Sequence, residues 1–240
     1  MIALLMALML GQGAACEENP AMMTAAAERA GVFDIQGAIA QLTNRPVRCA
    51  DSDVAYWYLR GLVAARDAYL YGGSPESLTP VKAAQAELGA RTSETATAEI
   101  AIVVLQAASA AAQSERESMA LLLDQALWLE QRQRDIGAPG APVLTAHEVA
   151  GDLWLQVHRF EDARRAYERA VQVVGVTRRI TLGLARVAVR LDDPTAACAE
   201  YARLVAGWPQ GASEPTELAE ARTFLRRAAC QDQPAGSARR

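Results

Sequence analysis

The chain has 240 residues, of which 51% are hydrophobic and 22% charged, and its formal net charge is −4. This composition is typical of a globular protein and excludes a disordered or fibrous chain. A sequence pI of 5.4 argues against nucleic acid as a partner, because phosphate binding needs a basic surface. Alanine makes up roughly a fifth of the residues and aromatics only 5%, which favours closely packed helices.

The first fifteen residues predict an export signal. Residues 1–15 contain no charged side chain, and residues 2–10 form an apolar run that small residues follow. A membrane-spanning helix needs about 20 residues, so this run instead fits the apolar core of a secretory signal peptide. Gly13 and Ala15 are the small residues that cleavage before Cys16 would require. We therefore expect an exported, periplasmic protein.

Four cysteines are present, namely Cys16, Cys49, Cys198 and Cys230. An even number in an exported chain favours disulfides, and closeness in sequence predicts the pairs Cys16–Cys49 and Cys198–Cys230. The segment Gly-Ala-Ala-Cys that ends at Cys16 also resembles the box of bacterial lipoproteins, although that box usually has leucine where this chain has Gly13. A lipid anchor at Cys16 is therefore the alternative, and Cys49 would then lack its partner.

The remainder of the chain predicts one helix after another. Expected helices cover residues 21–30, 34–42, 51–71, 80–88, 92–113 and 115–134, and residues 135–142 form a linker. Asp51 or Ser52 suits a helix N-cap, and residues 72–75 suit the end of that helix. The uncharged stretch 100–114 is too short to span a membrane and predicts a buried helix. No stretch alternates with the period of a strand, so we expect an all-α protein of antiparallel helix pairs.

Beyond the linker the sequence repeats itself with a period of 34 residues. A shift of that length places Ala163 on Ala197 and Tyr167 on Tyr201, and such a period with one helix pair per unit is typical of helical repeats. These residues resemble the tetratricopeptide repeat (TPR) family. The first unit carries the resemblance at Gly151, Trp154, Ala163, Tyr167 and Ala170, and the second at Ala185, Ala197, Tyr201 and Leu204. Alanine suits the close crossing of two helices, and the aromatic ring fills the gap to the next helix.

The resemblance implies a right-handed α–α superhelix, a TPR-like solenoid of antiparallel helix pairs. Together with the patterns described above, it gives the expected organisation: a signal peptide at 1–15, an N-terminal helical segment at 16–50, degenerate pairs at 51–143, two repeats at 144–211, a capping helix at 212–230 and a disordered tail at 231–240. About three repeats are needed for a shared core. We therefore expect the upstream helices to complete the same solenoid.

Candidate chemistry is sparse. His147 and His158 are the only histidines, and neither has the spacing of a metal site. Asp192 and Asp193 precede Pro194, where carboxylates cap a helix and stabilise its dipole. We therefore predict no enzyme activity, no cofactor and no metal. A helical enzyme or enzyme subunit without a recognisable motif is an alternative.

The resemblance implies a scaffold for protein–protein interaction that binds a partner peptide on its concave face, in the bacterial cell envelope. A lipid-anchored relative of this design, working in outer-membrane assembly, is the other reading. Between Arg178 and Cys230, eight arginines stand against six acidic residues, and Arg179, Arg186 and Arg190 share one helix face. We predict that these three arginines bind an acidic or carboxylate-ended peptide. A merely solvated arginine face is the alternative.

Overall fold

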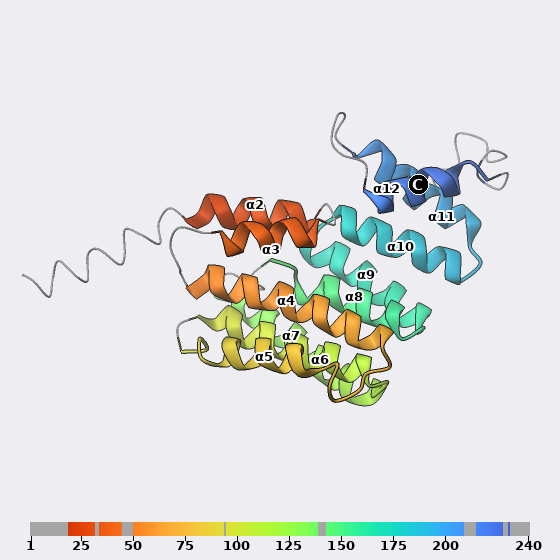
Figure 1. Cartoon of the computed structure of the whole chain (residues 1–240). Coiled ribbons are helices and arrows are strands. Elements are labelled where there is room, and N and C mark those ends of the chain that lie inside the picture. The colour runs from red at the N-terminus through yellow and green to blue at the C-terminus, as the bar shows by residue number, and fades with distance from the viewer. Residues whose placement is uncertain are drawn as a thin grey trace, which may run out of the picture. The chain divides into compact units, whose positions relative to one another are not determined.

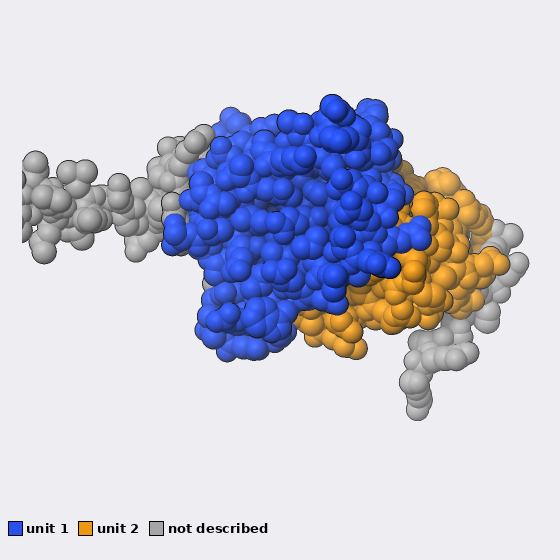
Figure 2. Space-filling model, turned by 90° about the horizontal axis from the view of Figure 1, so that it is seen from below, with its two compact units in different colours: residues 1–146 blue, residues 147–240 orange. Residues whose placement is uncertain are grey.

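The computed structural model describes residues 19–31, 34–44, 50–93, 95–138, 143–208, 215–227 and 230. These residues form eleven helices and no strand, so the all-α prediction is confirmed for the described part of the chain. The chain divides into two compact units, residues 1–146 and residues 147–240 (Figure 2). Each unit is described by itself below.

The described residues of unit 1 form six helices that pack on their neighbours (Figure 1). They are α2 (Asn19–Gly31), α3 (Ile35–Thr43), α4 (Ala50–Leu70), α5 (Thr79–Gly89), α6 (Ala96–Ala112) and α7 (Arg116–Asp135). Helix α4 contacts α3, α5 and α6, and α6 in turn contacts α7. The predicted helices are all present, with ends that differ by a few residues.

Helix α6 is the buried centre of this unit. Most of its residues are shielded from solvent, as the uncharged stretch that begins at residue 100 predicts. Gly61 of α4 lies so close to Leu105 of α6 that a Cβ atom at residue 61 would overlap the leucine side chain. The small residue thus permits a close crossing of the two helices. No helix among the described residues has the length and apolar character required to cross a membrane.

Two predicted helix starts in unit 1 are wrong. Helix α4 begins at Ala50, so Asp51 and Ser52 lie within its first turn and not at its N-cap. Helix α6 begins at Ala96 and not at Thr92, because Thr95 caps it by accepting a hydrogen bond from the Thr97 amide. In both cases several polar residues lie near the start of the helix, and the sequence alone does not show where the helix begins.

In unit 2 the part of the chain that the structure describes contains five helices. They are α8 (Ala146–Gln156), α9 (Phe160–Val174), α10 (Arg178–Arg190), α11 (Pro194–Ala206) and α12 (Thr216–Leu225). Helix α10 packs on α9 and α11, and α11 packs on α12. The closing helix is shorter than predicted, since α12 ends at Leu225.

The turns inside three helix pairs have the same backbone design. Ser114, His158 and Asp192 have positive φ angles of 64°, 60° and 55°, and each lies two residues before the start of a second helix, directly before its N-cap residue. The amide that follows each of them donates a hydrogen bond of 2.9 Å to the carbonyl five residues earlier. This left-handed bend satisfies the end of one helix and reverses the chain. The pairs α6–α7, α8–α9 and α10–α11 therefore share one turn, and the last two lie 34 residues apart.

The predicted disulfide between Cys198 and Cys230 is present. Cys198 lies on α11 and Cys230 follows α12, and their Cα atoms are 5.5 Å apart. The bond closes a loop that contains α12. The other predicted pair, Cys16–Cys49, lies outside the described residues, as do the signal segment 1–15 and the tail 231–240.

Candidate functional site

The arginines of α10 are the candidate binding residues, and the structure shows what each of them contacts. Arg178 donates two hydrogen bonds of 3.3 Å to the Gly207 carbonyl at the end of α11. Its guanidinium also lies 5.6 Å from the centre of the Trp208 ring. Arg178 therefore stabilises the C-terminus of α11, where a positive charge is favourable.

Arg179 binds a carboxylate of the preceding helix pair. Its guanidinium donates two hydrogen bonds to Asp152 Oδ2 of α8, the one from Nε measuring 2.9 Å. Asp152 Oδ1 accepts a third hydrogen bond of 2.6 Å from the Tyr167 hydroxyl of α9. Three helices are thus joined by one polar cluster, Asp152–Tyr167–Arg179. The Arg179 side chain is only 17% exposed and that of Asp152 31%, so the pair is largely removed from water.

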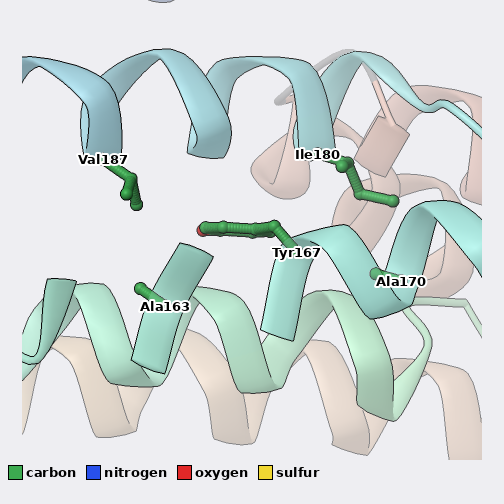
Figure 3. Close-up of a cluster of buried hydrophobic side chains, with 5 residues drawn as sticks. All are labelled: Ala163, Tyr167, Ala170, Ile180 and Val187. Atoms are coloured by element: carbon green, nitrogen blue, oxygen red, sulfur yellow. The ribbon is translucent and has the colours of Figure 1, made fainter. Parts of the chain in front are cut away.

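Tyr167 is held between two glycines. It is fully buried, and a Cβ atom at Gly151 of α8 or at Gly183 of α10 would overlap its ring. Figure 3 shows the ring extended between α9 and α10, with Val187 of α10 near its tip and Ile180 of α10 on the side of Ala170. The two glycines thus provide the space for the ring, and the hydroxyl at its tip reaches Asp152.

A second cluster repeats this arrangement one pair later, with the carboxylate on the other side. Arg186 of α10 donates two hydrogen bonds to Glu220 of α12, at 3.1 and 2.6 Å. The Tyr201 hydroxyl of α11 donates to Glu220 Oε1 at 2.6 Å. Phe224 of α12 lies against Tyr201, with the ring centres 4.9 Å apart. The Arg186 and Glu220 side chains are 41% and 34% exposed, so this pair is more open to water than the first.

Both clusters shift the ionisation of their members. Burial and the adjacent Asp152 raise the pKa of the Tyr167 hydroxyl well above its usual value. Burial lowers the pKa of the Arg179 guanidinium, but the charge and hydrogen bonds of Asp152 outweigh burial and leave the pKa raised. Burial raises the pKa of the Glu220 carboxyl, but the hydrogen bonds from Arg186 and Tyr201 outweigh it and leave the pKa lowered. Both tyrosines therefore stay neutral near neutral pH, and the Arg186–Glu220 pair stays charged.

Beside the second cluster lies a hollow of about 430 Å³. Its walls are mostly apolar and come from α10, α11 and α12 of unit 2. The lining includes Val189, Tyr201, Ala219, Glu220, Phe224 and Arg227. Arg227 lies over the Phe224 ring at 4.7 Å, and the charge of Glu220 is already neutralised by Arg186. The hollow therefore combines an apolar floor with a positive edge.

The three arginines predicted to bind a partner thus differ in their surroundings. Arg179 and Arg186 already bind carboxylates of the chain itself, which leaves little of either planar donor group for a partner. Arg190 ends α10 and is exposed. It follows Val189, which lines the hollow. Of the three, Arg190 is the one whose position best suits an external ligand.

The residues that carry the repeat pattern are in the interior of unit 2. Tyr167, Ala163, Ala170, Ala185, Ala197, Tyr201 and Leu204 are all at most 2% exposed. Gly151 is also buried, and Trp154 is partly buried against the cluster around Tyr167. These residues form the frame on which the polar clusters are built.

Asp152 and Glu220 were missed in the sequence, although a signal for them exists. Residues 152, 186 and 220 are separated by 34 residues each and carry acid, base and acid in turn. A search for charges that alternate along equivalent repeat positions would have found the Arg186–Glu220 pair. The Asp152–Arg179 contact lies between non-equivalent positions, so no such search would have found it.

The histidines and the Asp192–Asp193 pair lie in α8 and in the turns of unit 2. In the ranges that the structure describes, no group of three or more His, Cys, Asp or Glu side chains is arranged to hold a metal ion. His158 occupies the turn between α8 and α9, and His147 is buried in α8. Asp193 caps α11 by accepting a hydrogen bond of 3.0 Å from the Ala196 amide, as predicted, whereas Asp192 forms the left-handed bend.

Comparison with known proteins identifies no relative: no protein-family model, no curated protein and no solved structure matches the chain.

Proposed function

We propose that this protein is a TPR-like scaffold in which the first helices of successive pairs, α8, α10 and α12, form a right-handed superhelical surface that holds a segment of another protein. The observation that carries the proposal is the 34-residue register of the pairs α8–α9 and α10–α11, which share their turn and their buried tyrosine. Helix-pair repeats stack so that equivalent helices line one continuous face.

The partner chemistry that this surface favours is an apolar side chain next to an acidic group. The hollow offers an apolar floor at Val189 and Phe224, and Arg227 at its edge contributes a positive charge. Arg190 is the exposed arginine next to that wall. An acidic partner peptide would therefore bind here, with its apolar side chain in the hollow and its carboxylate on the arginines.

The proposed location is the periplasm of a bacterial cell envelope. Two features of different kinds support export, namely the apolar segment at residues 2–10 and the Cys198–Cys230 disulfide, since disulfides persist in oxidising compartments. Mass spectrometry of the mature N-terminus tests this point. A chain that begins at Cys16 without modification supports the soluble form, a lipid on Cys16 supports the anchored form, and an intact Met1 contradicts both.

Site-specific photo-crosslinking in the native cell tests the binding surface. A photoreactive residue at position 189 should yield a discrete adduct with one partner protein. A residue at position 169, exposed on α9, is the matched control and should not. Arg190→Glu and Arg227→Glu should each remove the adduct, while Arg169→Glu should leave it. Adducts of equal yield from positions 189 and 169, or no adduct at all, would contradict the proposal.

Arg179 and Arg186 are unsuitable for this test. Replacing either one breaks an ion pair inside unit 2, so a loss of binding would report on folding as much as on contact with a partner. Among the described residues, Arg190 and Arg227 form no ion pair, so their charges can be reversed with less effect on the fold of unit 2.

A further inference from the structure

Helix α7 has two large apolar side chains on its solvent-exposed surface. Leu121 is 72% exposed and Trp128 59%. They are seven residues apart, which places them on one face, about two turns or roughly 10 Å from each other. Arg132 lies over the Trp128 ring at 5.5 Å. A paired leucine and tryptophan on one exposed face are typical of a surface that another protein covers.

The residues of this face are arranged symmetrically about the middle of the helix. Glu117 precedes Leu121 by one turn, and Arg132 follows Trp128 by one turn. Asp124 and Gln125 stand between them, on either side of the midpoint. If a second copy of the helix is laid alongside in the reverse direction, Glu117 faces Arg132 and Leu121 faces Trp128. Asp124 then faces Gln125. All six of these side chains are exposed.

An acid near the start of a helix and a base near its end are expected from the helix dipole alone. The dipole does not account for Leu121 and Trp128, which lie at equal distances from the midpoint and are both exposed. It also does not account for Asp124 beside Gln125 at the centre. The whole face, and not its charges alone, is complementary to its own reverse.

We propose that α7 packs antiparallel against α7 of a second copy of this chain, around a two-fold axis that passes between residues 124 and 125. Each Trp128 then covers Leu121 of the second copy, and each Arg132 meets Glu117 of the second copy. At the axis, each Gln125 amide donates to Asp124 of the second copy. A two-fold interface needs such a self-complementary patch, and the antiparallel arrangement also opposes the two helix dipoles.

A membrane surface fits this face less well. Its charged members, Glu117, Asp124 and Arg132, sum to −1, which anionic headgroups would repel. A different protein would have no need for the symmetric order of residues. The inference does not depend on the proposed function, because α7 belongs to unit 1 and the hollow to unit 2.

Charge reversal with rescue tests the proposal. Sedimentation velocity of the wild-type protein over a concentration series should show a monomer–dimer equilibrium. Glu117→Arg and Arg132→Glu each place like charges opposite each other twice per dimer, and each should weaken dimerisation roughly tenfold or more. The double variant restores opposite charges and should recover most of the affinity. Arg169→Glu, an exposed reversal on α9, is the control and should leave the equilibrium unchanged.

Crosslinking locates the axis independently. In a protein with its native disulfide intact, Gln125→Cys lies next to the proposed two-fold axis, whereas two copies of Ser118→Cys would lie about 20 Å apart along the direction of the helices. A short bismaleimide should join Gln125→Cys into a dimer and leave Ser118→Cys monomeric. A wild-type protein that stays monomeric at all concentrations overturns the proposal. So does a dimer that the double variant fails to restore, or equal crosslinking at both positions, provided that thermal unfolding shows each variant folded.

Discussion

The helix pairs α8–α9 and α10–α11 have the same buried frame, but the polar clusters at their tyrosines are arranged in opposite ways. In both pairs a buried tyrosine, Tyr167 or Tyr201, donates its hydroxyl to a carboxylate that also binds an arginine of α10. For Tyr167 the carboxylate is Asp152 on the helix before it, and for Tyr201 it is Glu220 on the helix after it. The position equivalent to Asp152 in the second pair is Arg186. In both repeats the tyrosine hydroxyl therefore binds a carboxylate. The carboxylate comes from the preceding helix in the first repeat and from the following helix in the second.

The difference follows from where each pair stands in unit 2. Tyr167 has a glycine-bearing helix on each side, so its ring is enclosed by Gly151 and Gly183. Tyr201 is followed by the short helix α12, which contributes Phe224 and Glu220. The Cys198–Cys230 bond fastens the chain beyond this helix to α11. The inner pair, α8–α9, is thus held by packing. The outer pair, α10–α11, depends more on a covalent bond and on an ion pair that is partly exposed.

Removing the disulfide should produce the largest effect, and it should act on the outer pair. Replacing Cys198 and Cys230 with alanine releases a loop of 32 residues, which by the chain-entropy model costs about 3.7 kcal/mol. Hydrogen exchange should become faster in α11 and α12 and stay slow in α9. Equal acceleration in α9 and α11 would show that the two pairs do not differ in this way.

Enlarging a glycine next to Tyr167 should come second. Gly183→Ala introduces a Cβ atom into the space of the ring, and overpacking of this kind costs roughly 1–3 kcal/mol. Gly89→Ala is the control, because nothing lies near the added carbon. Urea unfolding measures both variants. A Gly183→Ala protein as stable as the wild type would mean that the ring can move aside.

Neutralising the carboxylate of each cluster should lower the free energy of unfolding by a smaller amount, and by different amounts in the two pairs. Asp152→Asn leaves the shielded Arg179 without its counter-charge and should cost roughly 2 kcal/mol. Glu220→Gln acts on a pair that is more than a third exposed on its arginine side, so solvent screening should hold the cost below about 1 kcal/mol. The comparison uses unfolding free energies of both variants at neutral pH, and a larger loss for Glu220→Gln would reverse the ranking.

The smallest expected effect is a pH dependence of the outer cluster. The folded protein holds the pKa of Glu220 below the ordinary value of 4.5, so this carboxylate stabilises the fold above that pH. The contribution is lost as the pH falls through the lowered pKa. The stability difference between wild type and Glu220→Gln should therefore shrink as the pH drops below about 4.5. Glu200, whose pKa burial raises, titrates in both proteins and cancels in the difference.

Much of the frame could be predicted from the sequence, because it depends on local patterns. The spacing of Ala163, Tyr167 and Ala170 predicts a helix face, and all three are fully buried. The position of Asp193 before Pro194 predicts the cap that is observed. These features need only neighbouring residues and a helical period.

The ion pairs of the two polar clusters could not be predicted from such local patterns. The spacing of Arg179, Arg186 and Arg190 showed that they share a face, but not that Asp152 and Glu220 would reach two of them. Those contacts join residues 27 and 34 positions apart, and they depend on which helix packs beside which. Helix ends were likewise uncertain where several polar residues stood together, as at Asp51 and Ser52.

The shared left-handed turn has a consequence for the order of folding. Because the bends at Ser114, His158 and Asp192 close each pair through residues only a few positions apart, each pair gains its first contacts at little loop-closure cost. We expect hairpins of two helices to form early and independently. The Cys198 thiol would meet Cys230 only after α12 has docked on α11. Formation of the Cys198–Cys230 disulfide would then be the last step, and it would stabilise a unit that is already folded.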